Sequence, residues 1–292
     1  MRKVCVASVQ MKCSNIVLEN IKNAEKFVRQ AVEKGANIVL LPELFERLYF
    51  CQERCYDYYN YATRVEENEA INHFKKIAKE LNVVLPISFY ERDGNRLFNS
   101  IAIIDANGEN LGVYRKTHIP DDHYYQEKFY FTPGDTGFKT FKSRYGTIGI
   151  GICWDQWFPE TARSLVLNGA EIIFYPTAIG SEPILECNSM EHWRRCMVGH
   201  SASNIVPVVV ANRIGKEEVF ASKENGGQSS SLEFYGSSFI TDEIGDIKES
   251  ANQDEEKVIC STFDLDEIAE KRLSWGLFRD RRPECYKVIT EK

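Results

Sequence analysis

The sequence has no long hydrophobic run, no excess of basic residues and no leader-like N-terminus. No stretch approaches the ~18 consecutive apolar residues of a membrane-spanning helix, and the apolar run near the start is too short for a signal peptide. Asp and Glu number 43 against 36 Lys and Arg, so the net charge is −7, which argues against a nucleic-acid surface. We therefore expect neither a membrane nor a nucleic-acid partner.

The nine cysteines also lack the patterns that bind metals or form a disulfide framework. Cys51 and Cys55 lie four positions apart rather than three. Cys187, His192 and Cys196 are loosely spaced, and no C-x-x-C or H-E-x-x-H motif is present. An odd, scattered set fits a reduced compartment, so we expect a cytoplasmic protein with neither a metal nor another cofactor.

What the sequence does have is an alternation of short apolar runs with helical segments, without a linker or repeat. Helical periodicity is found at 17–31, 69–81, 159–168, 190–203 and 265–273. Apolar runs predict strands at 4–9, 37–41, 83–87, 147–152, 171–175, 206–210 and 258–263, and a hairpin at 100–114. We expect Ser14 or Asn15 to cap the first helix and Gly35 to end it.

This order of elements predicts one α/β domain over residues 1–292. The continuous apolar runs at 37–41 and 206–210 indicate strands that are covered on both faces. The hairpin at 100–114 indicates a mixed sheet. A sandwich of helix, sheet, sheet and helix satisfies this pattern, and so does a three-layer open sheet.

Three potentially reactive residues each end an apolar strand: Glu43, Lys116 and Cys153. In open α/β sheets, ligands collect beyond the carboxyl ends of strands, so these residues are candidates for one site. Each also has a plainer interpretation. The cysteine could be a buried structural residue, the glutamate a loop residue and the lysine a solvated one.

The chemistry of these residue types suits nucleophilic catalysis. Cys153 lies in GICWDQWFPE, between a glycine-rich strand and a predicted helix, where a tight turn can present a thiolate near a helix N-terminus. The backbone N–H of Trp154 would help to hold an oxyanion. Glu43 would act as a general base if its pKa is raised, and Lys116 would place positive charge near the oxyanion.

Three sequence blocks carry a resemblance to a known family: LPELF (41–45), YRKTHIP (114–120) and GIGICWDQWFPE (149–160). They resemble the signature blocks of the nitrilase superfamily, whose members use a Glu–Lys–Cys triad. The resemblance implies that Glu43 is the general base, Lys116 the oxyanion stabiliser and Cys153 the nucleophile of an amidohydrolase.

The resemblance has further implications for the site and the assembly. The segment at 125–138 is similar to a family block that carries a second glutamate, so Glu127 is expected to position the lysine and the substrate. The family implies a four-layer α-β-β-α sandwich with mixed sheets. It also implies homo-oligomers paired through helices near the active site, with a C-terminal tail at about 275–292 packing on the oligomer.

Within the superfamily, further stretches resemble the N-carbamoylputrescine amidase branch, at 125–138, 178–183, 191–217 and 275–288. This resemblance implies a small cationic carbamoyl-amine substrate. An ammonium group needs a carboxylate or an aromatic face, and Glu182 is the candidate carboxylate. Trp154, Tyr49 and Tyr125 are candidate walls of the pocket. One departure is the bulkier Asp122-His123-Tyr124, where the branch usually has Gly-Pro-Gly.

Two alternatives remain open. A β-ureidopropionase or amino-acid carbamoylase would bind a carboxylate and need an arginine, for which Arg194 and Arg195 are candidates. A non-catalytic binding module of the same family is the other alternative, although an intact Glu, Lys and Cys set argues against it.

Overall fold

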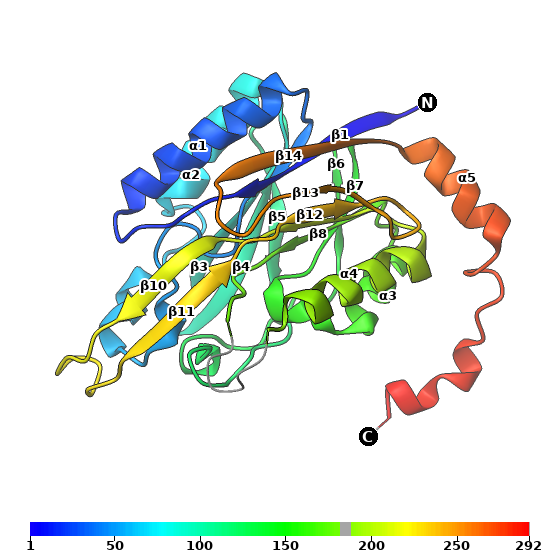
Figure 1. Cartoon of the computed structure of the whole chain (residues 1–292). Helices are drawn as coiled ribbons and strands as arrows, with labels where there is room; N and C mark the ends of the chain where they lie inside the picture. Colours follow the sequence, from blue (N-terminus) through cyan, green and yellow to red (C-terminus); the bar gives the residue numbers. More distant parts are fainter. Residues whose placement is uncertain (182–187, 292) are drawn as a thin grey trace.

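Two layers of β-sheet form the centre of the computed structural model, which describes residues 1–181 and 188–291 (Figure 1). In the first layer, β1 (Lys3–Gln10) is the middle strand of three. It pairs antiparallel with β14 (Lys257–Asp264) and parallel with β2 (Ile38–Leu40). The two ends of the chain thus contribute neighbouring strands.

The first layer continues as an antiparallel meander of β3 (Leu85–Asp93), β4 (Arg96–Ile104) and β5 (Asn110–Arg115). A parallel bridge between Ile38 and Val84 joins this meander to β2. The layer is therefore mixed, with parallel contacts at its centre and hairpins at its edge. The ends of β2 and β5 both lead into loops that carry buried charged residues.

The second layer is a six-stranded sheet in the order β13-β12-β9-β8-β7-β6, in which β7, β8 and β9 are parallel. Its strands are β6 (Thr140–Ser143), β7 (Gly146–Ile150), β8 (Ile172–Pro176), β9 (Val208–Ala211), β12 (Phe239–Thr241) and β13 (Ile247–Ser250). A separate hairpin of β10 (Ile214–Val219) and β11 (Ser230–Tyr235) projects from the body.

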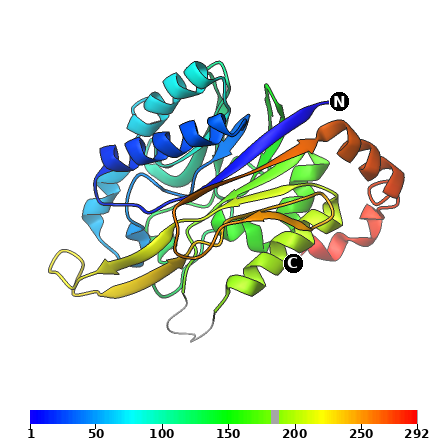
Figure 2. The same ribbon diagram turned by 45° about the horizontal axis from the view of Figure 1, so that its top comes forward.

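Helices cover the outer faces of both layers, as Figure 2 shows from a second side. The first layer is covered by α1 (Val17–Glu33) and α2 (Glu69–Leu81), and the second by α3 (Pro159–Leu167) and α4 (Met190–Asn204). Helix α5 (Leu265–Trp275) follows β14. The arrangement is the expected four-layer α-β-β-α sandwich with mixed sheets, and it excludes the three-layer open sheet.

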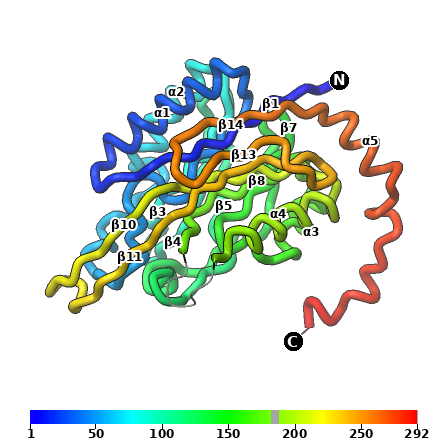
Figure 3. The backbone as a smooth tube through the Cα atoms, viewed as in Figure 1, coloured from blue at the N-terminus to red at the C-terminus, as the bar shows by residue number. Residues whose placement is uncertain are grey.

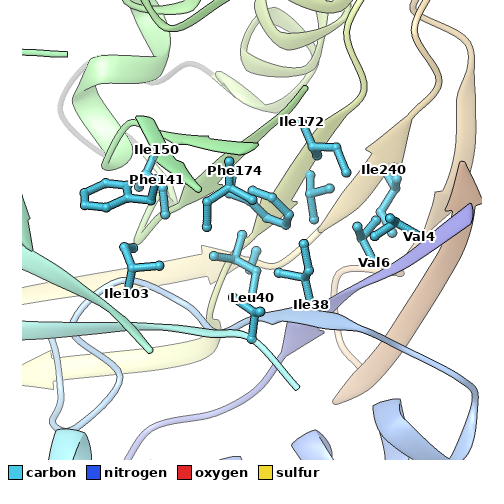
Figure 4. Packing of buried hydrophobic residues seen from close by; sticks show 14 of the residues in the cluster. Val4, Val6, Ile38, Leu40, Ile103, Phe141, Ile150, Ile172, Phe174 and Ile240 are labelled. Atoms are coloured by element: carbon cyan, nitrogen blue, oxygen red, sulfur yellow. The ribbon is translucent and has the colours of Figure 1, made fainter. Parts of the chain in front are cut away.

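Apolar side chains from the two facing sheets fill the space between them (Figure 4). Ile38, Leu40 and Ile103 of the first layer pack toward Ile150 and Phe174 of the second. Successive strand residues point to opposite faces, so the remaining apolar residues meet the helices. Each fully buried side chain of this kind stabilises the fold by roughly 1.5–3 kcal/mol.

One local prediction was wrong and one element was missed. Neither Ser14 nor Asn15 caps α1, because the helix begins after Ile16 and has no side-chain cap. The Ser14 hydroxyl accepts from the Ile16 N–H instead, and the Asn20 side chain bonds to the Ser14 backbone. The hairpin of β10 and β11 was not predicted, since its strands are short and rich in polar residues.

The chain beyond α5 runs along one side of the molecule to the C-terminus (Figure 3). It contains two short 3₁₀ turns, η5 (Pro283–Cys285) and η6 (Lys287–Ile289), in which no residue is buried. Trp275 and Val288 expose 71% and 82% of their surfaces. Trp275 ends α5, whereas Phe278 in the following segment is partly buried and packs against the core of the second layer.

Candidate active site

Four residues from both halves of the sandwich converge on one buried site: Glu43, Lys116, Glu127 and Cys153. Glu43 follows β2, Lys116 follows β5, and Glu127 opens the 3₁₀ turn η3 (Glu127–Phe129). Cys153 follows β7 and opens the 3₁₀ turn η4 (Cys153–Trp157). Glu43, Lys116 and Glu127 are fully buried, and Cys153 is 6% exposed.

The Lys116 ammonium is held between two carboxylates. Its Nζ donates to Glu43 Oε1 at 2.9 Å and to Glu127 Oε2 at 2.6 Å. Burial opposes the charged form, but Glu127 and Glu43 outweigh it and raise the pKa of Lys116 well above its usual value. The lysine therefore stays charged at neutral pH, which suits it to stabilising a developing oxyanion.

Glu127 is fixed from its other side by Tyr49. The Tyr49 hydroxyl donates to Glu127 Oε1 at 2.7 Å, and both residues are buried. Burial raises the pKa of Glu127, with Lys116 opposing it. Both oxygens of Glu127 are therefore engaged, one by the Lys116 ammonium and one by the Tyr49 hydroxyl.

Glu43 has one oxygen held and one oxygen open. Its Oε1 accepts from Lys116 and also from Asn99 Nδ2 at 2.7 Å. Across residues 1–181 and 188–291, its Oε2 has no hydrogen-bond partner. This oxygen is free to accept a proton, and the charge of Glu43 acts on the Cys153 thiol, although the two groups are not hydrogen-bonded to each other here.

A buried arginine supports the Glu43 loop from the second layer. Arg213 Nη2 donates to the backbone carbonyls of Glu43 and Leu44 at 2.8 and 2.9 Å. Its Nη1 donates to Glu217 Oε1 at 2.9 Å, so the buried charge is paired. Leu44 has a positive φ of 47°, a conformation that costs energy in a leucine and that these bonds stabilise.

Cys153 also has a strained backbone, with φ of 42°. Just before it, a Cβ on Gly151 would lie 2.8 Å from the Tyr175 ring, so the segment packs tightly against β8. The Cys153 Sγ accepts a hydrogen bond from Thr177 Oγ1 at 3.1 Å. Burial, and next the charge of Glu43, raise the pKa of the Cys153 thiol. The helix begins at Pro159 as predicted, and the 3₁₀ turn η4 lies between its N-terminus and Cys153.

Asp155 ties the cysteine segment to the lysine segment, and the sequence reasoning missed it. Its fully buried carboxylate accepts from the Tyr114 hydroxyl at 2.7 Å and from the Ile152 N–H at 3.0 Å. It also accepts from the His118 N–H at 2.9 Å and lies 2.8 Å from His118 Nδ1. Tyr114 and His118 flank Lys116, so one carboxylate sets the spacing of the two segments.

A cavity of about 530 Å³ opens onto Cys153 and Glu127. Its other lining residues include the aromatic side chains of Tyr125, Trp154 and Trp157 and the acidic Asp121 and Asp122. The volume suits a small molecule, and apolar walls with a few polar groups are typical of such sites.

The candidate substrate residues are distributed unevenly around this cavity. Tyr125 and Trp154 line it, whereas Tyr49 lies behind Glu127 and lines a different hollow. Glu182 lies outside the described residues. Arg194 and Arg195 do not line the cavity: Arg194 donates to Ser250 Oγ, and the Arg195 side chain is 75% exposed.

The described residues offer no group of three or more His, Cys, Asp or Glu side chains that could hold a metal ion. They also include no helix with the length and apolar character needed to cross a membrane. What the site does offer is a buried thiol, a carboxylate with one open oxygen and a charged lysine. Such a set can carry out acyl transfer through a covalent sulfur intermediate.

Comparison with known proteins agrees with this chemistry. Residues 5–273 match the family model described as carbon-nitrogen hydrolase. The chain is 56% identical to an N-carbamoylputrescine amidase from Oryza sativa subsp. japonica, over 98% of this chain and 94% of that protein. It is 47% identical to a citrullinase from Francisella tularensis, over the whole of both chains.

A crystal structure of a carbon-nitrogen hydrolase from Helicobacter pylori G27 has the same fold, with a TM-score of 0.89 and 33% identity over 99% of both chains. The near full-length similarity to N-carbamoylputrescine amidases places the sequence in that branch of the nitrilase superfamily. The protein is therefore a member of the carbon-nitrogen hydrolase family, whose enzymes hydrolyse carbon–nitrogen bonds other than peptide bonds.

Proposed function

We propose that the protein hydrolyses N-carbamoylputrescine to putrescine, carbon dioxide and ammonia, with Cys153 as nucleophile. The observation that carries this proposal is the buried set in which Lys116 joins Glu43 and Glu127 beside Cys153. The relatives at 51–56% identity that are named N-carbamoylputrescine amidases support the choice of substrate. The product amine places the reaction in polyamine synthesis.

In the first half of the reaction, the Cys153 S–H bond breaks and its proton moves to Glu43 Oε2. The sulfur electron pair attacks the ureido carbonyl carbon, and the carbonyl π electrons move to the oxygen. Lys116 and the Trp154 N–H hold this oxyanion. When the oxyanion collapses, the bond to the terminal nitrogen breaks, ammonia leaves with the proton from Glu43, and a carbamoyl thioester remains.

In the second half, Glu43 takes a proton from a water molecule whose oxygen attacks the thioester carbon. The carbon–sulfur bond breaks, the thiol regains its proton, and the carbamate of putrescine is released. The carbamate then loses carbon dioxide to give the free amine. Glu127 keeps Lys116 in place through both halves, because its own oxygens are bonded to Lys116 and Tyr49.

The composition of the cavity wall supports a cationic substrate. Asp121 and Asp122 lie at the cavity together with the ring faces of Tyr125 and Trp154, which can attract an ammonium group. Its described lining residues include no arginine, and the basic side chains among them are Lys128 and His192. Glu182 remains a candidate carboxylate for the same ammonium.

Residues 1–292 are proposed to act as one domain within a homo-oligomer in the cytoplasm. The support for association is the tail at 275–292, which exposes Trp275, Val288 and Ile289. Apolar side chains of this size are usually covered in an assembly. Measuring the mass of the full chain and of a chain ending at residue 274 by light scattering tests this part of the proposal. An unchanged mass would contradict the role of the tail.

The decisive experiment measures ammonia release from N-carbamoylputrescine, citrulline and N-carbamoyl-β-alanine at equal concentrations. We expect the first substrate to be turned over with the highest kcat/KM, and Cys153→Ala to lower kcat by roughly 10⁴-fold or more while the fold is retained. Preference for citrulline would reassign the substrate and keep the chemistry. Full activity in Cys153→Ala, or thiol labelling without turnover of any substrate, would end the proposal.

A further inference from the structure

The hydroxyl of Thr177 contacts the sulfur of Cys153, and the proposed mechanism gives it no role. Thr177 comes directly after β8 and is fully buried. Its Oγ1 lies 3.1 Å from Cys153 Sγ, in donor geometry. The backbone N–H donates to the Ala211 carbonyl at 2.8 Å, which extends the pairing of β8 with β9 and fixes the residue. Its position is therefore set by the sheet and not by the cysteine.

Gln156 determines where the Thr177 proton points. Gln156 Nε2 donates to Thr177 Oγ1 at 3.2 Å, and the Gln156 side chain is fully buried. A threonine hydroxyl has one proton and two lone pairs, whereas an amide nitrogen only donates. With the Gln156 amide in this orientation, the hydroxyl accepts from Gln156 and its single proton is left for the sulfur. The three side chains form a short donor chain that ends at Sγ.

The sulfur needs such a donor because its surroundings disfavour a thiolate. Burial is the largest effect that raises the pKa of the Cys153 thiol, and the carboxylates of Glu43 and Glu127 add to it. The charge of Lys116 acts in the opposite direction. Within the described chain, Thr177 is the one side chain that donates a hydrogen bond to Sγ. The other contact of Sγ is with the Ala178 carbonyl, which can only accept.

We propose that Thr177 is a further catalytic residue, whose hydroxyl donates to the Cys153 thiolate and stabilises it relative to the thiol. This inference rests on the proposed role of Cys153 as the nucleophile. When the S–H bond breaks, the proton goes to Glu43 and the electron pair stays on sulfur, while Thr177 keeps its own proton. A hydrogen bond of this kind is strongest to the charged sulfur and weak to a thioester. It therefore favours formation of the thiolate at the start of the cycle. It also favours departure of the thiolate when the thioester is hydrolysed.

The test measures how fast iodoacetamide alkylates Cys153 at a series of pH values, with mass spectrometry of the Cys153 peptide separating it from the other cysteines. Thr177→Val replaces the hydroxyl with a methyl group of similar size. We expect the midpoint of the alkylation profile to rise by about one pH unit, which lowers the rate roughly tenfold at each pH below the midpoint. kcat/KM should fall about as far, with KM for the ureido substrate nearly unchanged.

Two variants separate this role from packing. Thr177→Ser restores a hydroxyl and should return the profile to within a few tenths of a pH unit of the wild type. Thr161→Val is the matched control, because Thr161 is equally buried and its hydroxyl has no partner among the described residues. It should leave the profile unchanged. If Thr177→Val does not fold, Thr177→Ala removes the same hydroxyl without adding a methyl group near Gln156.

A profile of Thr177→Val that superimposes on the wild type overturns the inference, and so does a Thr177→Ser variant as impaired as Thr177→Val. Because alkylation needs no substrate, the outcome is separate from the choice of N-carbamoylputrescine. A shifted profile in an enzyme that hydrolyses only another ureido compound supports Thr177 and refutes the substrate. A wild-type Cys153 that iodoacetamide never modifies overturns the inference, whereas the substrate is decided by turnover alone.

Discussion

The Tyr114 hydroxyl donates a 2.7 Å hydrogen bond to the buried carboxylate of Asp155, joining the end of β5 to the turn that carries Cys153. The same carboxylate oxygen accepts from the Ile152 N–H, one residue before the cysteine. Lys116 lies two residues beyond Tyr114. The spacing between Lys116 and Cys153, the proposed oxyanion stabiliser and nucleophile, is therefore set by a contact that involves neither of them.

Tyr114→Phe removes this bond, together with the 3.0 Å hydrogen bond between the same hydroxyl and Thr117 Oγ1, and leaves the ring in the core. A hydrogen bond to a charged, buried group contributes about 1.5–3 kcal/mol, so the free energy of unfolding should fall by that amount. kcat should fall several-fold because small displacements in a site are costly to rate. Urea unfolding and ammonia release measure the two effects. Tyr145→Phe is the control, since among the described residues that hydroxyl bonds only the Asn82 carbonyl. Equal activity in the two variants would contradict a positioning role for Asp155.

Removing the charge of Glu127 should impair turnover through Lys116. Glu127→Gln leaves the ammonium with one carboxylate instead of two, and we expect kcat to fall about 10²-fold with a smaller change in KM. Tyr49→Phe removes only the outer bond to Glu127, so its kcat should fall a few-fold. Steady-state kinetics of both variants measure these changes in kcat and KM. A Tyr49→Phe variant more impaired than Glu127→Gln would show that the tyrosine acts in another way.

The charge of Asp122 should matter for cationic substrates alone. Asp122→Asn removes a charge at the cavity wall, where an exposed ion pair contributes up to about 1 kcal/mol. KM for N-carbamoylputrescine should rise about 2- to 5-fold, with no change for neutral n-butylurea. Asp246→Asn, an exposed aspartate of the β12–β13 turn, is the control and should alter neither value. Equal effects of Asp122→Asn on both substrates would refute recognition of the ammonium.

Glu46 makes stability depend on pH in a defined direction. Burial raises the pKa of this carboxyl from 4.5 to about 7, with the Asn68 hydrogen bond opposing it. Between these values the folded state holds a proton that the unfolded state has released, so stability falls as pH rises from about 4.5 to 7. Because the side chain is only partly buried, the loss should be about 1–2 kcal/mol.

Glu46→Gln removes this titration. The free energy of unfolding of the variant, measured in urea, should therefore rise relative to that of the wild type between pH 5 and pH 8. For Glu25→Gln, the free energy of unfolding should instead fall relative to that of the wild type as pH rises. Burial of Glu25 is outweighed by Arg29 and His73, which lower its pKa, so its contribution is present at neutral pH and is lost as pH falls. Parallel pH profiles for wild type and Glu46→Gln would contradict the assignment.

Features governed by neighbours in the sequence were the ones that could be predicted. Helix α2 was predicted from its periodicity, and its start is fixed by Asn68, whose side chain accepts from the Ile71 N–H three residues on. The positions of Glu43 and Lys116 followed from the rule that ligand sites gather at strand ends. The N-cap of α1 was missed because the Ser14 segment is bonded to Asn20 and not to the helix start.

The residues that support the site were harder to predict because their partners are distant in the sequence. Asp155 contacts Tyr114 across 41 residues, and Arg213 contacts the Glu43 carbonyl across 170. No local pattern distinguishes them from surface charges. Thr177 did carry a signal, since it follows an apolar strand directly, as Glu43 and Lys116 do. Thr177 was not predicted as a site residue because a neutral hydroxyl at the end of a strand is a weaker sign of function than a charged side chain.

The reach of Arg213 also has a consequence for how the protein is made. The guanidinium that holds the Glu43 and Leu44 carbonyls comes late in the chain, so a ribosome releases the general-base loop long before its support. During that interval Glu43, Lys116 and Glu127 exist without the arginine that shapes the loop. Contacts between such distant segments close slowly, so the reactive cysteine should acquire its full nucleophilicity only at the end of folding.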